Sequence, residues 1–156
     1  MTGQPYIYMS ASALFSSLKL AGLELPNRIV VSPMCQYSAV EGTPTDWHLV
    51  HYGGLANSGA GLVVVEATHV ESLGRITLGC LGIYSDENEA GIARFLACCR
   101  KLGSARFGIQ LNHAGRKASS NKPWIGIKSA LEAAEGWETV SASGIPFGPD
   151  WHTPRE

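Results

Sequence analysis

Arg28-Ile29-Val30-Val31-Ser32-Pro33-Met34-Cys35-Gln36-Tyr37-Ser38 joins a short β-branched run to a proline and a group of chemically capable side chains. Its apolar start has the composition of a strand that is buried on both faces. Pro33 cannot donate to a sheet ladder, so we expect regular pairing to stop near it. Cys35 and Tyr37 then follow the carboxyl end of the strand, where α/β proteins place ligands. Taken alone, the stretch fits equally well a plain strand, a turn and two half-buried residues.

Two further apolar runs repeat this arrangement of a buried strand and a polar end. Leu62-Val63-Val64-Val65 is followed by Glu66-Ala67-Thr68-His69, and Phe107-Gly108-Ile109-Gln110-Leu111 is followed by Asn112-His113-Ala114-Gly115-Arg116-Lys117. Between the strands we predict two helices. The first begins near Trp47, is capped by Thr45 or Asp46, and places its apolar face at Trp47, Val50, His51, Gly54 and Leu55.

Asp86 and Glu89 have the spacing of a capping box and mark the start of the second helix, which ends at Gly103. A small hairpin over residues 18–27 precedes the first strand, and residues 75–84 form a loop or a second hairpin. The order is hairpin, β, α, β, α, β and loop. This order predicts an α/β fold with a parallel sheet, either a partial barrel or a small open sheet.

Residues 118–156 show little periodicity and form a long loop, of the kind that often covers a site. Near their end, Thr153 and Pro154 suit the cap and first turn of a helix. A helix that begins without a body indicates a truncated chain.

Composition excludes several classes of protein. The 156 residues can form one domain, and 45% hydrophobic with 16% charged residues is a globular composition. A net charge of −1 without a basic run gives no support to a nucleic-acid or membrane partner. Lys19 is the first basic residue, which argues against a secretory signal. The four unevenly spaced cysteines are interpreted as reduced thiols in a cytoplasmic protein.

The polar groups at the strand ends favour cofactor binding over hydrolysis. They comprise a thiol, a phenol, a carboxamide and cations, without a Ser-His-Asp set. His48 and His51 lie three residues apart on a helix but have no evident third ligand, so no metal site is predicted.

Three motifs together resemble the old yellow enzyme family, which are FMN-dependent NAD(P)H ene-reductases on a (β/α)8 barrel. They are residues 27–38, residues 66–68 and residues 108–117, each at a predicted strand end. The cysteine and tyrosine after Ser-Pro-Met resemble the bacterial branch of the family. The resemblance covers roughly residues 14–156 and corresponds to the amino-terminal part of a family member. It implies a partial TIM barrel over residues 13–156, about three βα units preceded by a hairpin, after an irregular extension at residues 1–12.

The resemblance also implies a role for each site residue. Ser32, Pro33, Met34 and Cys35 would lie against the flavin, with the Cys35 thiol tuning its electron affinity. Ala67 would line the ring through its backbone. Gln110, at a buried strand end, would pair its carboxamide with the pyrimidine edge.

Tyr37 would hydrogen-bond the carbonyl of an activated alkene and is the catalytic candidate, with Lys117 as a second substrate contact. Hydride would pass from NADH or NADPH through flavin N5 to the alkene. Glu66 and His113 are interpreted as structural, Arg116 as a salt-bridge former, and the tryptophans as packing residues.

Some parts of the family pattern are missing from the sequence. No histidine pair follows the third motif, and neither the flavin-facing arginine nor the phosphate site is present. We therefore expect partners: a small enone-like substrate, and either a complementary carboxyl-terminal half or further copies of the chain. One alternative is a non-catalytic fragment used only for interaction or assembly. Another is a small thiol enzyme that uses Cys35 as its nucleophile.

Overall fold

The computed structural model describes residues 12–125, 130–132 and 134–156, so nearly all of the expected irregular extension at residues 1–12 lies outside the described residues. A parallel sheet forms the centre of the fold. Its strands are β3 (Val30–Val31), β4 (Leu62–His69), β5 (Leu81–Gly82) and β6 (Arg106–Asn112). β3 and β5 both pair with β4, and β6 pairs with β4 along its whole length. Because a strand has two edges, β3 and β5 share one edge of β4 and β6 occupies the other.

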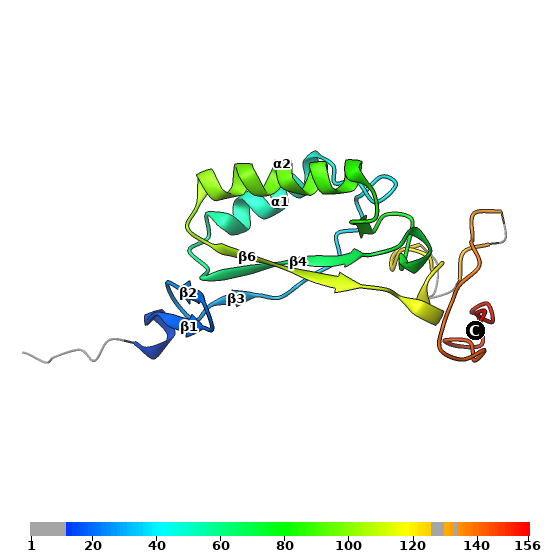
Figure 1. Cartoon of the computed structure of the whole chain (residues 1–156). Helices are drawn as coiled ribbons and strands as arrows, with labels where there is room; N and C mark the ends of the chain where they lie inside the picture. The colour runs from blue at the N-terminus through cyan, green and yellow to red at the C-terminus, as the bar shows by residue number, and fades with distance from the viewer. Residues whose placement is uncertain (1–11, 126–129, 133) are drawn as a thin grey trace, which may run out of the picture.

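Two helices cover one face of this sheet, as Figure 1 shows. α1 spans Asp46–Ala56 and α2 spans Asp86–Leu102. The predicted cap Thr45 closes α1 in a capping box with His48. The cap of α2 is Ser85, whose hydroxyl accepts a hydrogen bond from the Asn88 N–H. Asp86 is therefore the first residue of the helix and not its cap. The predicted stop at Gly103 is confirmed. The sequence therefore located the start of α1 and both ends of α2 to within a residue.

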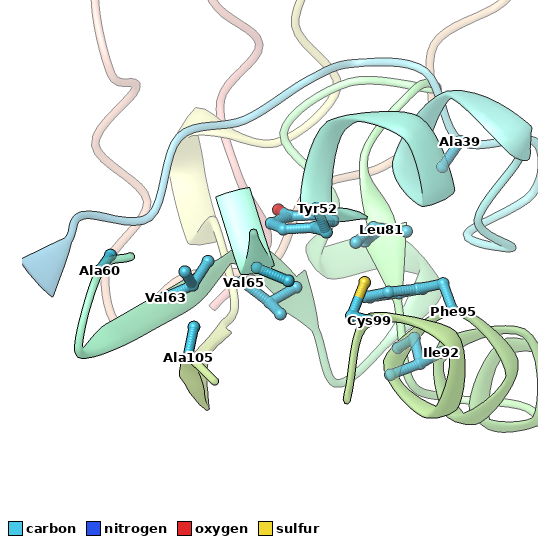
Figure 2. Close-up of a cluster of buried hydrophobic side chains, with 11 residues drawn as sticks. Ala39, Tyr52, Ala60, Val63, Val65, Leu81, Ile92, Phe95, Cys99 and Ala105 are labelled. Carbon is cyan, nitrogen blue, oxygen red and sulfur yellow. The ribbon is translucent and has the colours of Figure 1, made fainter. Parts of the chain in front are cut away.

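The hydrophobic core lies between the helices and β4 (Figure 2). Val63 and Val65 of β4 point toward the helices, and from α2 the core takes Ile92, Phe95 and Cys99. The Phe95 ring stacks on Tyr52 of α1, with ring centroids 5.2 Å apart and planes 16° from parallel. This stack joins the two helices above the sheet.

The predicted inner face of α1 is wrong. Trp47 and Val50 are exposed, the latter at 71%, whereas His48, Tyr52, Gly53 and Ala56 are buried. The helix carries apolar residues on both faces, so hydrophobic periodicity could not identify the buried one. Contact with β4 and α2 decides which face turns inward.

The prediction that the first strand is buried on both faces is also wrong. Val30 is 48% exposed and β3 contains only two residues. In the described part of the chain, β3 pairs on one side only, with β4. β6 is open in the same way, with Ile109 and Leu111 exposed. Both strands are therefore edges of the described sheet.

The remaining elements are a hairpin and an irregular tail. β1 (Leu18–Leu20) and β2 (Leu23–Leu25) form the predicted antiparallel hairpin. β5 pairs in parallel with β4, so the hairpin considered for residues 75–84 does not form. Short 3-10 turns lie at Ala13–Phe15, Ser72–Gly74 and Gly115–Lys117. The helix start predicted at Thr153 is absent, because Arg155 instead forms a bridge with Val140. The described part of residues 118–156 is otherwise loop, as predicted.

Two glycine substitutions should have opposite effects on stability. A Cβ at Gly103 would collide with the carbonyl oxygen of Ala56, where the chain leaves α2 and passes the end of α1. Gly103→Ala should therefore lower the free energy of unfolding by about 1–3 kcal/mol. Gly54 lies within α1 with open space around it, so Gly54→Ala should raise stability by about 0.5–1 kcal/mol. Urea denaturation checks both, and equal effects of the two changes would contradict the expected collision.

Candidate functional site

The polar ends of β4 and β6 are aligned by an irregularity in their pairing. Val65 pairs with Ile109, but the next pair is Ala67 with Gln110, so Glu66 is an extra residue in β4. Such a bulge changes the direction in which the following side chains point. Paired residues of parallel strands face the same side of a sheet, which places Ala67 and Gln110 next to each other on one face.

Gln110 is exposed rather than buried as the sequence predicted. β6 is an edge of the described sheet, so nothing covers this strand end. The Gln110 carboxamide has no hydrogen-bond partner within the described part of the chain. Its donor and its acceptor are therefore both available to a ligand.

Cys35 lies on the other side of Ala67, in irregular backbone after β3. It is half-buried and free, and it hydrogen-bonds to the backbone of Ala67 and to the thiol of Cys80. The Cys80 contact and burial raise the pKa of the Cys35 thiol above its usual range. This direction speaks against Cys35 as the nucleophile of a thiol enzyme. Cys35, Ala67 and Gln110 thus come from three neighbouring strand ends.

The residues before Cys35 are accessible. Ser32 and Met34 are exposed and Pro33 is partly buried, all in backbone that has left the sheet. The carboxamide of Gln36 donates to the Met34 carbonyl at 2.8 Å and holds the turn closed. The four predicted contacts at residues 32–35 therefore form one open stretch of backbone.

Tyr37 adopts a strained backbone conformation with φ at +53°. Gly79 packs so closely on the Tyr37 carbonyl that a side chain there would overlap it. The Tyr37 ring meets Trp124 edge to face, with centroids 5.4 Å apart. Burial is the largest cause that raises the pKa of Tyr37 to about 12, so the hydroxyl is a proton donor at neutral pH. A strained backbone conformation that is fixed by such contacts indicates a functional position.

Tyr37 and Lys117 line the same cavity, of about 230 Å³. The Lys117 ammonium lies 5.7 Å from the centroid of the Phe147 ring, which also lines the cavity. The other lining residues are Ile76, Thr77, Ser120, Asn121, Pro123 and Trp151. The structure thus brings together the two residues that the sequence proposed as substrate contacts. Residues of the long loop, among them Pro123, Phe147 and Trp151, line this cavity.

Glu66 is fully buried beneath the turn that carries Cys35. Its Oε2 accepts the Gln36 N–H at 2.8 Å, and its Oε1 accepts the Tyr52 hydroxyl at 3.3 Å. The Tyr52 oxygen in turn accepts the Glu66 N–H at 2.8 Å. Burial raises the pKa of Glu66 from 4.5 to about 7. The structural interpretation of Glu66 agrees with these bonds.

His48 faces the same carboxylate from α1. Its Nδ1 accepts the Thr45 N–H at 3.0 Å, which assigns the ring proton of the neutral form to Nε2. Nε2 lies 3.6 Å from Glu66 Oε1 and makes no hydrogen bond. Burial lowers the pKa of His48 to about 4. A neutral histidine and a carboxyl group with a raised pKa therefore share this buried position.

Other predicted residues are structural. His113 hydrogen-bonds Glu71 at 3.1 Å and accepts the Gly115 N–H. Arg116 donates to the hydroxyls of Ser141 and Ser143, so the ion pair expected for it does not form among the described residues. Trp137 and Trp151 use their indole N–H groups to bond Leu73 and Ser120. No three His, Cys, Asp or Glu side chains in the described ranges are placed to hold a metal ion.

The sequence missed Cys80. Cys80 lies in a glycine-rich stretch without periodicity, and no local pattern relates it to Cys35. Contact between these segments depends on β5 pairing with β4, which only the fold reveals.

Comparisons with known proteins identify the family of the chain. The family model described as NADH:flavin oxidoreductase / NADH oxidase family matches residues 13–142. An NADPH dehydrogenase from Geobacillus sp. (strain WCH70) is 41% identical over 145 residues, which are 92% of this chain and 38% of that protein. An NADH:flavin oxidoreductase from Gibberella zeae is 41% identical over 81% of this chain and 31% of its own length.

Solved structures share the fold. Morphinone reductase superposes with a TM-score of 0.72 at 26% identity, over 95% of this chain and 40% of that one. The old yellow enzyme from Trypanosoma cruzi gives 0.73 at 27% identity, over 92% and 42%. The chain thus spans between about a third and two fifths of the length of these relatives. In the part of the chain that is described, no helix is long and apolar enough to cross a membrane.

Proposed function

The chain belongs to the NADH:flavin oxidoreductase / NADH oxidase family, and we propose that it supplies one side of the FMN site of an NAD(P)H-dependent ene-reductase. We further propose that it derives from the bacterial cysteine-and-tyrosine branch of that family. The observation that carries the proposal is the alignment of Cys35, Ala67 and Gln110 at three neighbouring strand ends.

The residues fit a flavin ring. Gln110 offers an unused donor and an unused acceptor, which match the alternating oxygen and nitrogen atoms of a pyrimidine edge. The open backbone of Ser32, Pro33 and Met34 would contact the ring, with Ala67 beside Gln110. Cys35 would place a weakly polar sulfur next to it. The cofactor, when bound, supplies hydride transfer between NADH or NADPH and an activated alkene.

Tyr37 and Lys117 would bind the substrate in the cavity that they line. The Tyr37 hydroxyl retains its proton at neutral pH and can donate a hydrogen bond to an enone carbonyl. Lys117 adds a positive charge to the same cavity. The edge-to-face contact with Trp124 orients the Tyr37 ring, which supports Tyr37 as the catalytic residue.

We propose that activity needs more of the barrel than the described residues provide. Ile109 and Leu111 are exposed on β6, whose outer edge offers unpaired backbone groups to a further strand. A complementary carboxyl-terminal half would cover that edge, as would further copies of the chain. Residues 13–156 would then form the amino-terminal portion of the FMN-binding barrel. The four free cysteines support a cytoplasmic location.

Titration of FMN with the chain tests the proposal. Binding next to Cys35 and Gln110 should quench FMN fluorescence at micromolar concentrations of protein. Absence of quenching at high micromolar protein would favour the alternative of a non-catalytic assembly piece. Such a piece would bind its partner through the exposed edge of β6.

Gln110→Leu provides the sharper prediction. Loss of both hydrogen-bonding groups should weaken FMN binding about tenfold, because one tenfold step corresponds to about 1.4 kcal/mol, within the worth of two neutral hydrogen bonds. Leu111→Ala is the matched control, since it is the next residue on the opposite face of β6 and is exposed. Equal dissociation constants for the Gln110 variant and the control would contradict the proposed contact.

A further inference from the structure

Cys35 and Cys80 are direct neighbours, although 44 residues separate them in the sequence. Each thiol is free, and a hydrogen bond joins the two sulfurs. Cys80 is fully buried, whereas Cys35 is partly accessible at the open end of the sheet. Cys35 can therefore meet a small molecule directly, whereas Cys80 is shielded from solvent.

The surrounding backbone holds the two cysteines together. The Ala39 N–H donates to the Gly79 carbonyl at 2.9 Å, and Gly79 packs directly on the Tyr37 carbonyl. These contacts fix the segment before Cys80 against the segment after Cys35. The two cysteines therefore lie on segments that are held against each other, as a disulfide between them requires.

Cys80 sits among hydrogen-bond donors. Its sulfur accepts the Thr77 N–H at 3.4 Å and lies 3.4 Å from the Thr77 hydroxyl. With the Cys35 contact as the largest cause, these bonds lower the pKa of Cys80 to about 6. Cys80 is therefore the sulfur of the pair that more readily carries the negative charge.

We propose that Cys35 and Cys80 are a modification site at which a low-molecular-weight disulfide such as oxidised glutathione converts the pair into a reversible intramolecular disulfide. Cys35 would lie beside the flavin, but neither cysteine forms or breaks a bond in the proposed hydride transfer, so the disulfide adds a function to the fold. In a reducing compartment the pair stays reduced, and it is oxidised only when the disulfide form of the small thiol accumulates.

Two exchange steps account for the chemistry. Because Cys80 carries the negative charge, the reduced pair holds one proton, on Cys35. Cys35 passes this proton to the Cys80 thiolate and attacks one glutathione sulfur, which forms a mixed disulfide and releases a glutathione thiolate. Cys80 then gives that proton to the released thiolate and attacks the Cys35 sulfur, which forms the intramolecular bond and releases the second glutathione as a thiolate that solvent protonates. Two cysteine thiols are oxidised and one small disulfide is reduced to two thiols.

The consequence for FMN depends on the proposed function. Bonding to the buried Cys80 would draw the Cys35 sulfur away from the ring and shift the backbone at Met34. We expect the oxidised chain to bind FMN about tenfold more weakly than the reduced chain.

Peptide mapping by mass spectrometry tests the disulfide without requiring FMN. The chain is incubated with oxidised glutathione, blocked with N-ethylmaleimide and digested without reduction. We expect a linked peptide pair containing Cys35 and Cys80, while Cys98, which is half-buried on α2, carries glutathione and serves as an internal control. In Cys80→Ser, Cys35 should instead carry glutathione as Cys98 does.

The proposal would be overturned if, in the unaltered chain, Cys35 carried glutathione and Cys80 remained unlinked. This measurement does not depend on whether a variant folds. A linked peptide with unchanged FMN affinity would overturn the expected effect on the cofactor site. If neither redox form binds FMN, the proposed function fails while the linked peptide is still measured independently.

Discussion

Phe95→Ala is expected to lower the free energy of unfolding by about 3–5 kcal/mol, the usual cost of removing a buried phenylalanine ring. Phe95 is 2% exposed and stacks on Tyr52, so its removal leaves a cavity at the contact between α2 and α1. Because a small domain is stable by only about 5–15 kcal/mol, this loss would place the chain near its unfolding threshold.

Val50→Ala is the control for this prediction. It removes an apolar side chain from α1, but from the solvent-facing side, and should change stability by no more than about 0.5 kcal/mol. Urea denaturation followed by circular dichroism compares the two variants. A loss at Val50 as large as that at Phe95 would mean that the face of α1 inferred from the sequence, rather than the observed one, turns inward.

Glu66→Gln is expected to alter how stability depends on pH. In the folded chain burial raises the pKa of Glu66 from 4.5 to about 7, so the folded state favours the protonated carboxyl group. The stability that the protonated Glu66 adds to the folded state is fully present below about pH 4.5 and is lost as pH rises through 7. The stability of the variant relative to the unaltered chain should therefore increase over this range, by on the order of 3 kcal/mol, since one pKa unit is about 1.4 kcal/mol.

His48 contributes with the opposite sign. Its pKa is lowered from 6.5 to about 4, so its stabilising effect appears as pH rises from about 4 to 6.5. The two groups offset each other in the unaltered chain, and Glu66→Gln should leave the rising contribution of His48 uncompensated. Thermal denaturation across pH 4.5–8 measures this difference. Glu24→Gln, at an exposed carboxylate, is the control, and parallel pH profiles for the Glu66 variant and the unaltered chain would refute the prediction.

Local signals in the sequence were sufficient to identify both helices and the β1–β2 hairpin. Gly103 ends α2 where the sequence places the stop, and Thr45 caps α1. These predictions succeed because capping and termination depend on residues within one turn. The same local logic failed at Thr153, since Arg155 instead pairs with Val140, a contact between distant residues.

Burial could not be predicted from the same signals. Val30 and Gln110 belong to apolar runs that read as buried strands, yet both are exposed because β3 and β6 are edges of the described sheet. The inner face of α1 was misassigned for a related reason, since Val50 and Tyr52 are both apolar enough to face a core. Strand order and the position of α2 determine which of these side chains are buried.

The sequence by itself determined the hairpin, the order of β3, α1, β4, α2 and β6, the three polar strand ends and the residues that resemble a flavin-binding family. These features depend on short segments of the sequence, because periodicity, caps and motifs each involve only a few neighbouring residues. Only the tertiary structure decided that a bulge at Glu66 aligns Ala67 with Gln110, that Tyr37 shares a cavity with Lys117, and that Cys80 lies against Cys35. The physical reason is that these contacts join segments far apart in the chain, and their distances are set by strand pairing and by the packing of helices on the sheet.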